Sequence, residues 1–466
     1  MNLQRNKWVK SSIAIFAITL SSCEDFVNVS PPNDQLATPT VYTDNVTATA
    51  ALLNVYAGLM AESWCIGSGG LTIFPGLSAD ELINESTSTD WDQFYSNSLN
   101  EKNSDLEKKI WTNGYQQIYA ANSVIEGLTR SAELSSDLKT TLLGEAKFMR
   151  AFIHFYLTNL FGDIPLVTTT DYRINSKIPR TSQSEIYSQI IKDLIDSENL
   201  LGTEYLDAEN SSTHERVRPN KYVVQAFLAR VFLYQKDWSK AEDYATKVIN
   251  INPLYTLEKN PDNVFLKEST EAIWQLKPSN PVISTYEGSN FILDTTPSYA
   301  SLQKDLVNQF NQEDERKKWV DSIKVGTTTY YYPTKYKTKQ TSTAYEHTEY
   351  YMMIRLAEIY FIRSEARAQL NNLIGSQEDL NIIRTRANLS PISNSEQETI
   401  LEYIQIERRI ELFTELGHRW FDLKRWNMAN SVIAEKSKNW SPTDALYPIP
   451  YIQIQNDPSV KQNPGY

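Results

Sequence analysis

Aromatic residues in stretches rich in Ser, Thr and Asn are the residues of this sequence best suited to ligand binding. A flat ring offers an apolar face to the C–H surface of a sugar, and neighbouring Asp, Asn and Ser side chains bond its hydroxyl groups. Any one ring could instead be packed in a local cluster, because large aromatic side chains are mostly buried. Together they predict exposed loop rings, with one acid, around a single cleft: Trp64, Asp80, Trp91, Tyr95, Tyr286, Phe291 and Tyr299.

The densest run of charges, residues 406–426 ("IERRIELFTELGHRWFDLKRW"), offers a different chemistry. Glu411, Glu415 and Asp422 could serve as the paired carboxylates of a glycosidase. Catalysis, however, needs an acid isolated from cations, and here the acids alternate with arginines. A helix would place them as ion pairs, Glu415 with Arg419 and Asp422 with Arg425. The segment therefore predicts a structural helix and a protein that is not an enzyme, although folding could still bring two carboxylates together.

Motifs for a metal, a nucleotide or an activated nucleophile are absent from the sequence. The four histidines are scattered, and there is no HExxH, CxxC, GxSxG, GxxxxGK[ST] or Rossmann pattern. We therefore predict no cofactor and no metal site. Residues 327–341 ("TTTYYYPTKYKTKQT") interleave tyrosine with lysine, as single-strand nucleic-acid platforms do, but alternation of this kind is more typical of a half-exposed strand.

The N-terminus has the features of an export signal that ends in a lipidated cysteine. Three basic residues precede a short apolar run at residues 13–20, and Leu20-Ser21-Ser22-Cys23 fits cleavage by a lipoprotein signal peptidase. We predict a signal peptide at residues 1–22 and two or three acyl chains on Cys23, enough for stable attachment to a membrane. Residues 23–38 are acidic and rich in Pro and Asn, which predicts an extended tether.

The charge and cysteine content narrow the class of protein further. The formal charge is −12, and it becomes −15 when residues 1–22, with Arg5, Lys7 and Lys10, are removed. A chain this acidic is a poor nucleic-acid binder. With Cys23 acylated, Cys65 has no partner for a disulfide, so we expect it to be a small buried hydrophobic residue.

Helical repeats are the elements expected to position the binding residues. In residues 221–253 the spacing of small and apolar residues matches a tetratricopeptide repeat, with Leu228, Ala229 and Phe232 on one helix and Ala241, Ala245 and Val248 on the next. Weaker copies occur at residues 142–201 and 350–389. Residues 255–345 break the helical pattern, and we expect short strands and long loops there. The predicted fold is mainly α, with the body at residues 39–466.

Sequence blocks spread from residue 20 to the C-terminus resemble the SusD/RagB family of surface lipoproteins. They are the Cys23 segment with "EDFVNVSP", "WTNGYQQIYAAN" from Trp111, "EAKFMRAFIHFYLTNLFGDIPLV" from Glu145, "RLAEIYFIRSEA" from Arg355, "RTRANL" from Arg384, "ERRIELFTELGHRWFDLKRW" from Glu407 and the ending "YPIPYIQIQNDPSVKQNPGY". The resemblance implies about four tetratricopeptide-like helix pairs in a right-handed superhelix, packed against an irregular lobe that holds the ligand site.

The resemblance also implies a function. Members of the family are non-catalytic and capture glycans, or in some members peptides, at the surface of the outer membrane. They cap a SusC-like TonB-dependent transporter, which would be the partner of this chain. Glu24 and Asp25 resemble the signal that directs such lipoproteins to the outer face. The sequence thus predicts an oligosaccharide-binding lipoprotein, with a peptide as the alternative ligand.

Overall fold

The computed structural model describes residues 41–251, 253–393 and 396–466. The predicted signal peptide, the lipid attachment at Cys23 and the predicted tether lie outside these residues. Among the helices that are described, none combines the length and the apolar character needed to cross a bilayer.

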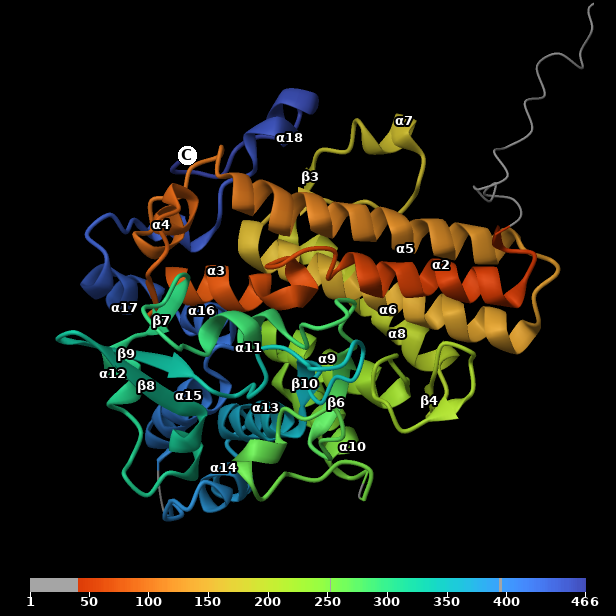
Figure 1. The fold of residues 1–466 in the computed structure, drawn as a ribbon. Helices are drawn as coiled ribbons and strands as arrows, with labels where there is room; N and C mark the ends of the chain where they lie inside the picture. The colour runs from red at the N-terminus through yellow and green to blue at the C-terminus, as the bar shows by residue number, and fades with distance from the viewer. Residues whose placement is uncertain (1–40, 252, 394–395) are drawn as a thin grey trace, which may run out of the picture.

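Helices dominate the architecture, and the long ones lie in roughly parallel layers across the molecule (Figure 1). The helices are α2 (Asn45–Gly58), α3 (Leu71–Ser78), α4 (Thr89–Tyr95), α5 (Asn113–Arg130), α6 (Ser136–Phe161), α7 (Tyr172–Asn175), α8 (Gln183–Leu200), α9 (Lys221–Tyr234), α10 (Trp238–Ile249), α11 (Tyr286–Phe291), α12 (Lys304–Val307), α13 (Leu356–Gln369), α14 (Leu373–Arg386), α15 (Gln397–Leu412), α16 (His418–Arg425), α17 (Ala429–Lys436) and α18 (Tyr451–Asn456). The mainly α fold predicted from the sequence is confirmed.

The strands are short and pair only in twos within the described residues. They are β1 (Leu82–Asn84), β2 (Ile164–Pro165), β3 (Arg180–Thr181), β4 (Tyr205–Leu206), β5 (Ser212–Thr213), β6 (Ala272–Leu276), β7 (Ala300–Leu302), β8 (Val320–Val325), β9 (Thr328–Pro333) and β10 (Tyr351–Arg355). Of the Tyr-rich segment predicted to be a half-exposed strand, residues 328–333 form β9, which pairs with β8 as a hairpin, whereas residues 334–341 lie outside any strand.

The helix pair α9 and α10 forms where the tetratricopeptide pattern places it. Asn220 caps the first helix by accepting from the amides of Tyr222 and Val223, and Asp237 caps the second. The six small or apolar residues of the pattern are all buried, and the alanines of α10 let the two helices cross closely. The pairs α6 with α8 and α13 with α14 occupy the regions of the weaker copies, and α2 packs on α5.

One boundary of these repeats differs from the prediction. The segment from Tyr351 to Arg355 forms β10, paired antiparallel with β6, so α13 begins only at Leu356. All five β10 residues are buried. The sequence of such a strand does not alternate between apolar and polar residues, so its pattern cannot be distinguished from that of a buried helix. The strand joins the inserted region to the pair of α13 and α14.

The helix predicted across residues 406–426 is broken. Its α15 part ends at Leu412, and three residues with positive φ, namely Thr414, Leu416 and Gly417, turn the chain before α16. The expected Glu415–Arg419 pair therefore does not form, because the helical register is lost between them. Asp422 and Arg425 both lie in α16 and do pair, at 2.7 Å. Ile406, expected on the buried side, is 48% exposed.

Buried ion pairs take the place of the predicted Glu415–Arg419 pair. The Arg355 guanidinium lies between three carboxylates, 2.8 Å from Glu271, 2.6 Å from Glu411 and 2.8 Å from Glu415. The arginines around Glu411 and Glu415 hold the pKa values of both carboxyls below their ordinary value, although burial alone would raise them. This network joins the inserted region to the C-terminal helices.

Candidate functional site

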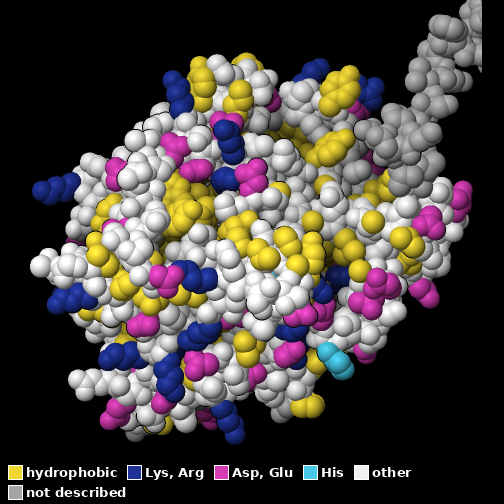
Figure 2. Space-filling model, viewed as in Figure 1, with side chains coloured by type: hydrophobic (Ala, Val, Ile, Leu, Met, Phe, Trp, Pro, Cys, Tyr) yellow, Lys and Arg dark blue, Asp and Glu magenta, His cyan; other side chains and the backbone are white. Residues whose placement is uncertain are grey.

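Four of the seven predicted binding residues meet in one aromatic cluster. The Trp64 ring lies 5.7 Å from Trp91, 6.0 Å from Phe291 and 5.7 Å from Tyr299, and Trp91 lies 5.5 Å from Tyr299. We call these four residues the ring cluster. They come from three segments far apart in the chain: the loop after α2, helix α4, and the stretch from α11 to β7. On the face shown in Figure 2, hydrophobic side chains gather where Figure 1 places α3, α4 and α11.

A tight loop at residues 64–70 aims Trp64 at the cluster. Trp64 has φ 65°, and its amide donates to the carbonyl of Ser68, 3.1 Å away. Gly69 has φ 93°, and a Cβ atom there would lie 3.0 Å from the Trp64 ring. At Gly70 a Cβ would lie 2.2 Å from the Trp64 carbonyl oxygen. The "SGG" sequence, which offers no signal beyond a turn, is thus required for the position of Trp64.

Helix α4 supplies Trp91, and a carboxylate fixes the orientation of its ring. The indole N–H of Trp91 donates to Asp105, 2.9 Å away. Burial and the nearby Asp90 raise the pKa of Asp105, while the hydrogen bond from Trp91 lowers it. On its other side Trp91 packs edge-on against Phe74 of α3, at 5.8 Å.

The prediction that the rings are exposed is wrong for most of the cluster. Trp64, Trp91 and Phe291 are only 5%, 5% and 2% exposed, because the rings pack against one another and against the core. Trp91 and Phe291 also lie in short helices, not in loops. Tyr299 is half-buried and forms the more open part of the cluster.

Tyr95 and Tyr286 stand apart from the four rings. Tyr95 is half-buried one turn after Trp91, with the ammonium group of Lys436 4.8 Å from its ring centre. Tyr286 is half-buried at the start of α11, where its amide N–H donates to the hydroxyl of Tyr351, 3.1 Å away. The structure therefore places both tyrosines at the edges of the region.

Asp80 is not free to bind a ligand. Its carboxylate accepts from Arg419 at 2.7 and 2.9 Å and pairs with Arg409 at 2.7 Å. Burial raises its pKa, but the hydrogen bonds and charges of the two arginines outweigh burial and hold the pKa below its ordinary value. Asp80 instead joins the segment after α3 to α15 and α16. The sequence offered no sign of these partners, which lie more than 300 positions away.

The buried carboxyl of Glu287 lies beside the loop that carries Trp64. Glu287 of α11 accepts from Thr72 at 3.1 Å, and its Oε2 atom has no hydrogen-bond partner among the described residues. A Cβ atom on Gly69 would lie 3.2 Å from the Glu287 carboxyl carbon, so Gly69 separates this acid from Trp64. Burial raises the pKa of Glu287 to about 7. Sequence reasoning missed Glu287, Asp105 and Phe74, because their roles come from contacts between distant segments.

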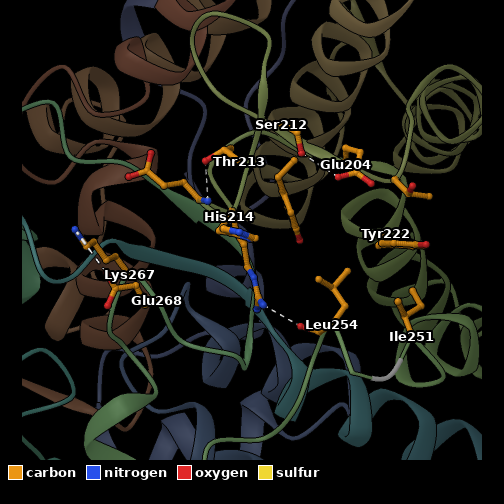
Figure 3. Close-up of a pocket in the computed structure, with 13 residues that line it drawn as sticks. Glu204, Ser212, Thr213, His214, Tyr222, Ile251, Leu254, Lys267 and Glu268 are labelled. Atoms are coloured by element: carbon orange, nitrogen blue, oxygen red, sulfur yellow. Dashed lines mark hydrogen bonds and ion pairs between the residues drawn. The ribbon is translucent and has the colours of Figure 1, made fainter.

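A separate cavity of about 690 Å³ lies between the β4–β5 hairpin, the start of α9 and the loop after α10. Figure 3 shows Tyr222, Ile251 and Leu254 on one side of it and Lys267 and Glu268 on the other. Arg216 reaches it, but its guanidinium donates to backbone carbonyls of the wall, those of Leu254, Ser269, Thr270 and Ala272. With one half-buried ring, Tyr222, this cavity suits sugar stacking less well than the ring cluster does.

The described residues also bear on metal and acid–base chemistry. Among them no group of three or more His, Cys, Asp or Glu side chains is arranged to hold a metal ion. Asp422, like Glu411 and Glu415, is buried beside arginines that hold its pKa below its ordinary value, despite burial. Such carboxylates are poor proton donors. Cys65 is buried, as predicted, and burial raises the pKa of its thiol.

Comparison with known protein families decides the identity of the fold. Residues 25–233 match the family described as "Starch-binding associating with outer membrane", and residues 232–443 match the "SusD family". The chain belongs to the SusD/RagB family. Three of the blocks that resembled this family, those from Arg355, Arg384 and Glu407, supply residues of the arginine network.

Individual SusD-like proteins align along almost the whole chain. SusD-like protein P2 of Formosa agariphila is 25% identical, over 99% of this chain and 100% of its own length. A SusD superfamily protein from Bacteroides vulgatus superposes with a TM-score of 0.80 at 21% identity, covering 92% of this chain and 100% of its own. A structure described as a laminarin binding SusD-like protein has a TM-score of 0.75 at 22% identity, covering 90% of this chain and 99% of its own.

Proposed function

We propose that this SusD-like protein captures oligosaccharides at the ring cluster on the cell surface and delivers them to a SusC-like TonB-dependent transporter. The observation that carries the proposal is the convergence of Trp64, Trp91, Phe291 and Tyr299 from three distant segments. Aromatic side chains with Asp and Ser neighbours recognise the C–H faces and hydroxyl groups of sugars. The family description and the laminarin-binding relative support a glycan ligand.

The state of the carboxylates supports binding without catalysis. The acids that could act as a glycosidase pair, Glu411 and Glu415, are both salt-bridged to Arg355 in the core. Asp105, at the ring cluster, holds the indole of Trp91. The protein thus acts as a receptor, and purified protein should release no reducing sugar from oligosaccharides.

The affinity of the isolated protein should be modest. A stacked ring contributes only about 0.5–1.5 kcal/mol beyond the area it buries, so several rings together give micromolar to millimolar binding. A transporter that closes the other side of the site would raise the affinity through added contacts and a high effective concentration. Attachment through Cys23 keeps the receptor at the membrane.

A glycan array run beside a peptide panel tests the ligand class, with isothermal titration for each hit. The proposal predicts oligosaccharide hits and no peptide hit of comparable affinity. Peptide hits alone would favour the peptide-binding alternative. Absence of any small ligand, with retention of a transporter partner in pull-downs from native membranes, would point to a protein-binding scaffold.

Acyl-chain labelling that persists in Cys23→Ala would contradict the lipid anchor at Cys23.

A further inference from the structure

Acidic residues contact the ring cluster or flank its residues in the chain. Asp105 bonds the Trp91 indole, and Asp90 precedes Trp91 and accepts from Ser104 at 2.6 and 3.0 Å. The amide of Glu85 donates to the carbonyl of Tyr299 at 3.0 Å. Glu62 and Asp294 stand two and three residues from Trp64 and Phe291, and are 72% and 78% exposed at their side chains. The ring of Trp91 therefore bonds a carboxylate, Trp64 and Phe291 each have an acid within three residues in the chain, and the backbone of Tyr299 is bonded to that of Glu85.

The lysines of this region are already engaged with those acids. Lys109 pairs with Glu62, and Lys339 pairs with Asp294. The positive charge of Lys108 favours the ionised forms of the Glu62 and Asp105 carboxyls. Of the charged groups named around the cluster, the acids outnumber the lysines: Glu62, Glu85, Asp90, Asp105 and Asp294 against Lys108, Lys109 and Lys339.

Two further lysines near the rings point into the protein. Lys335 donates to the carbonyls of Glu411 and Phe413 and to the Glu415 carboxylate. Lys436 donates to the carbonyls of Leu77 and Ser78. Neither ammonium group is placed to receive a sulfate or a carboxylate from a ligand.

We infer that the ring cluster accepts uncharged oligosaccharides and rejects sulfated or uronic-acid glycans. The inference rests on the proposed function, since it names the class of glycan for the same site. A polyanionic glycan would bring its charges against the unpaired excess of carboxylates and would have to break the Lys109 and Lys339 pairs to find partners. A neutral chain needs only the open face of Tyr299, which is half-buried, and hydroxyl acceptors, which the acids supply.

The test is a panel in which each neutral glycan is paired with a sulfated form of the same backbone, for example laminarin and sulfated laminarin. Binding is measured by titration with the intact protein at low and at high salt. At low salt we expect each neutral glycan to bind at least about tenfold more tightly than its sulfated form, a gap of about 1.4 kcal/mol in binding free energy. The gap should narrow at high salt, because added ions screen the repulsion.

A double variant, Glu62→Gln with Asp294→Asn, tests the cause. Both side chains are highly exposed, so folding should be unaffected, and the change removes two acids while it frees Lys109 and Lys339. Affinity for the sulfated form should rise, with little change for the neutral form. Glu398→Gln with Glu402→Gln, on the exposed face of α15, makes the same change in net charge and should alter neither.

The outcomes separate the two claims. The inference would be overturned, with glycan binding left in place, by either of two results. One is tighter binding of the sulfated glycan than of the neutral glycan by the wild-type protein. The other is an equal rise in affinity for the sulfated glycan in both double variants. Failure of every neutral and sulfated glycan to bind would overturn the proposed function, and the inference with it.

Discussion

The indole N–H of Trp91 donates a 2.9 Å hydrogen bond to a carboxylate oxygen of Asp105, which follows it by fourteen residues. The contact ties helix α4 to the segment before α5 and sets the angle at which the Trp91 ring meets Trp64 and Tyr299. An acid with no evident role in the sequence thus orients a central ring of the candidate site.

Asp105→Ala should weaken both folding and ligand binding. It leaves a nearly buried indole N–H without an acceptor, which costs about 1–3 kcal/mol in the free energy of unfolding. Loss of the productive ring angle should lower affinity for an oligosaccharide roughly 2- to 12-fold. Asp105→Asn keeps an acceptor oxygen and should restore both, as measured by urea unfolding and titration. Equal loss in the two variants would mean that charge, and not the hydrogen bond, matters.

Gly69→Ala should displace Trp64. A Cβ atom at this position would lie 3.0 Å from the Trp64 ring and 3.2 Å from the Glu287 carboxyl carbon, and φ is 93°. We expect a marked loss of affinity and a changed near-ultraviolet dichroism spectrum. Gly326→Ala is the matched control, because Gly326 also has a positive φ, 61°, but its Cβ would meet no atom within 4 Å. Identical behaviour of the two variants would show that backbone strain alone is responsible.

Glu287 should make stability depend on pH. Burial raises the pKa of this carboxyl from 4.5 to about 7. The folded state therefore holds a proton that the unfolded chain has lost, and stability falls as the pH rises from about 4.5 to about 7. The fall is on the order of 3 kcal/mol, and Glu287→Gln should remove it. Parallel curves of unfolding free energy against pH for the two proteins would contradict the assignment.

Arg355→Met should be severely destabilising. The change leaves Glu271, Glu411 and Glu415 buried without their shared cation, which costs about 3–5 kcal/mol. Arg130→Met is the control, since the side chain of Arg130 is 78% exposed in its pair with Glu126, and such a pair contributes about 0.5 kcal/mol or less. Urea unfolding measures both. A small effect at Arg355 would mean that the carboxylates find other partners or take up protons.

Local patterns made the helix pairs predictable, whereas long-range contacts decided the site. The spacing of Leu228, Ala229 and Ala245 reports helix crossing within one short unit, and the structure bears it out. Nothing local shows that Asp80 lies against Arg419, or that Thr414 and Gly417 turn the chain between two helical segments.

The rings illustrate the same limit. Their residue type and polar surroundings predicted that they work together, and four of them do meet. Their exposure could not be predicted, because the burial of Trp64 and Trp91 results from packing against Phe291 and Tyr299, some 200 positions later.

The most direct test of the account removes the accessible part of the ring cluster and measures glycan binding. Tyr299→Ala is the variant, since Tyr299 is half-buried and contacts both Trp64 and Trp91. Tyr172→Ala, in α7 and 77% exposed, is the control. By isothermal titration with a neutral oligosaccharide hit, the account predicts that Tyr299→Ala loses roughly 2- to 12-fold or more in affinity while Tyr172→Ala binds as wild type does. Unchanged affinity in Tyr299→Ala, with the fold intact by circular dichroism, would contradict the central claim that the ring cluster is the binding site.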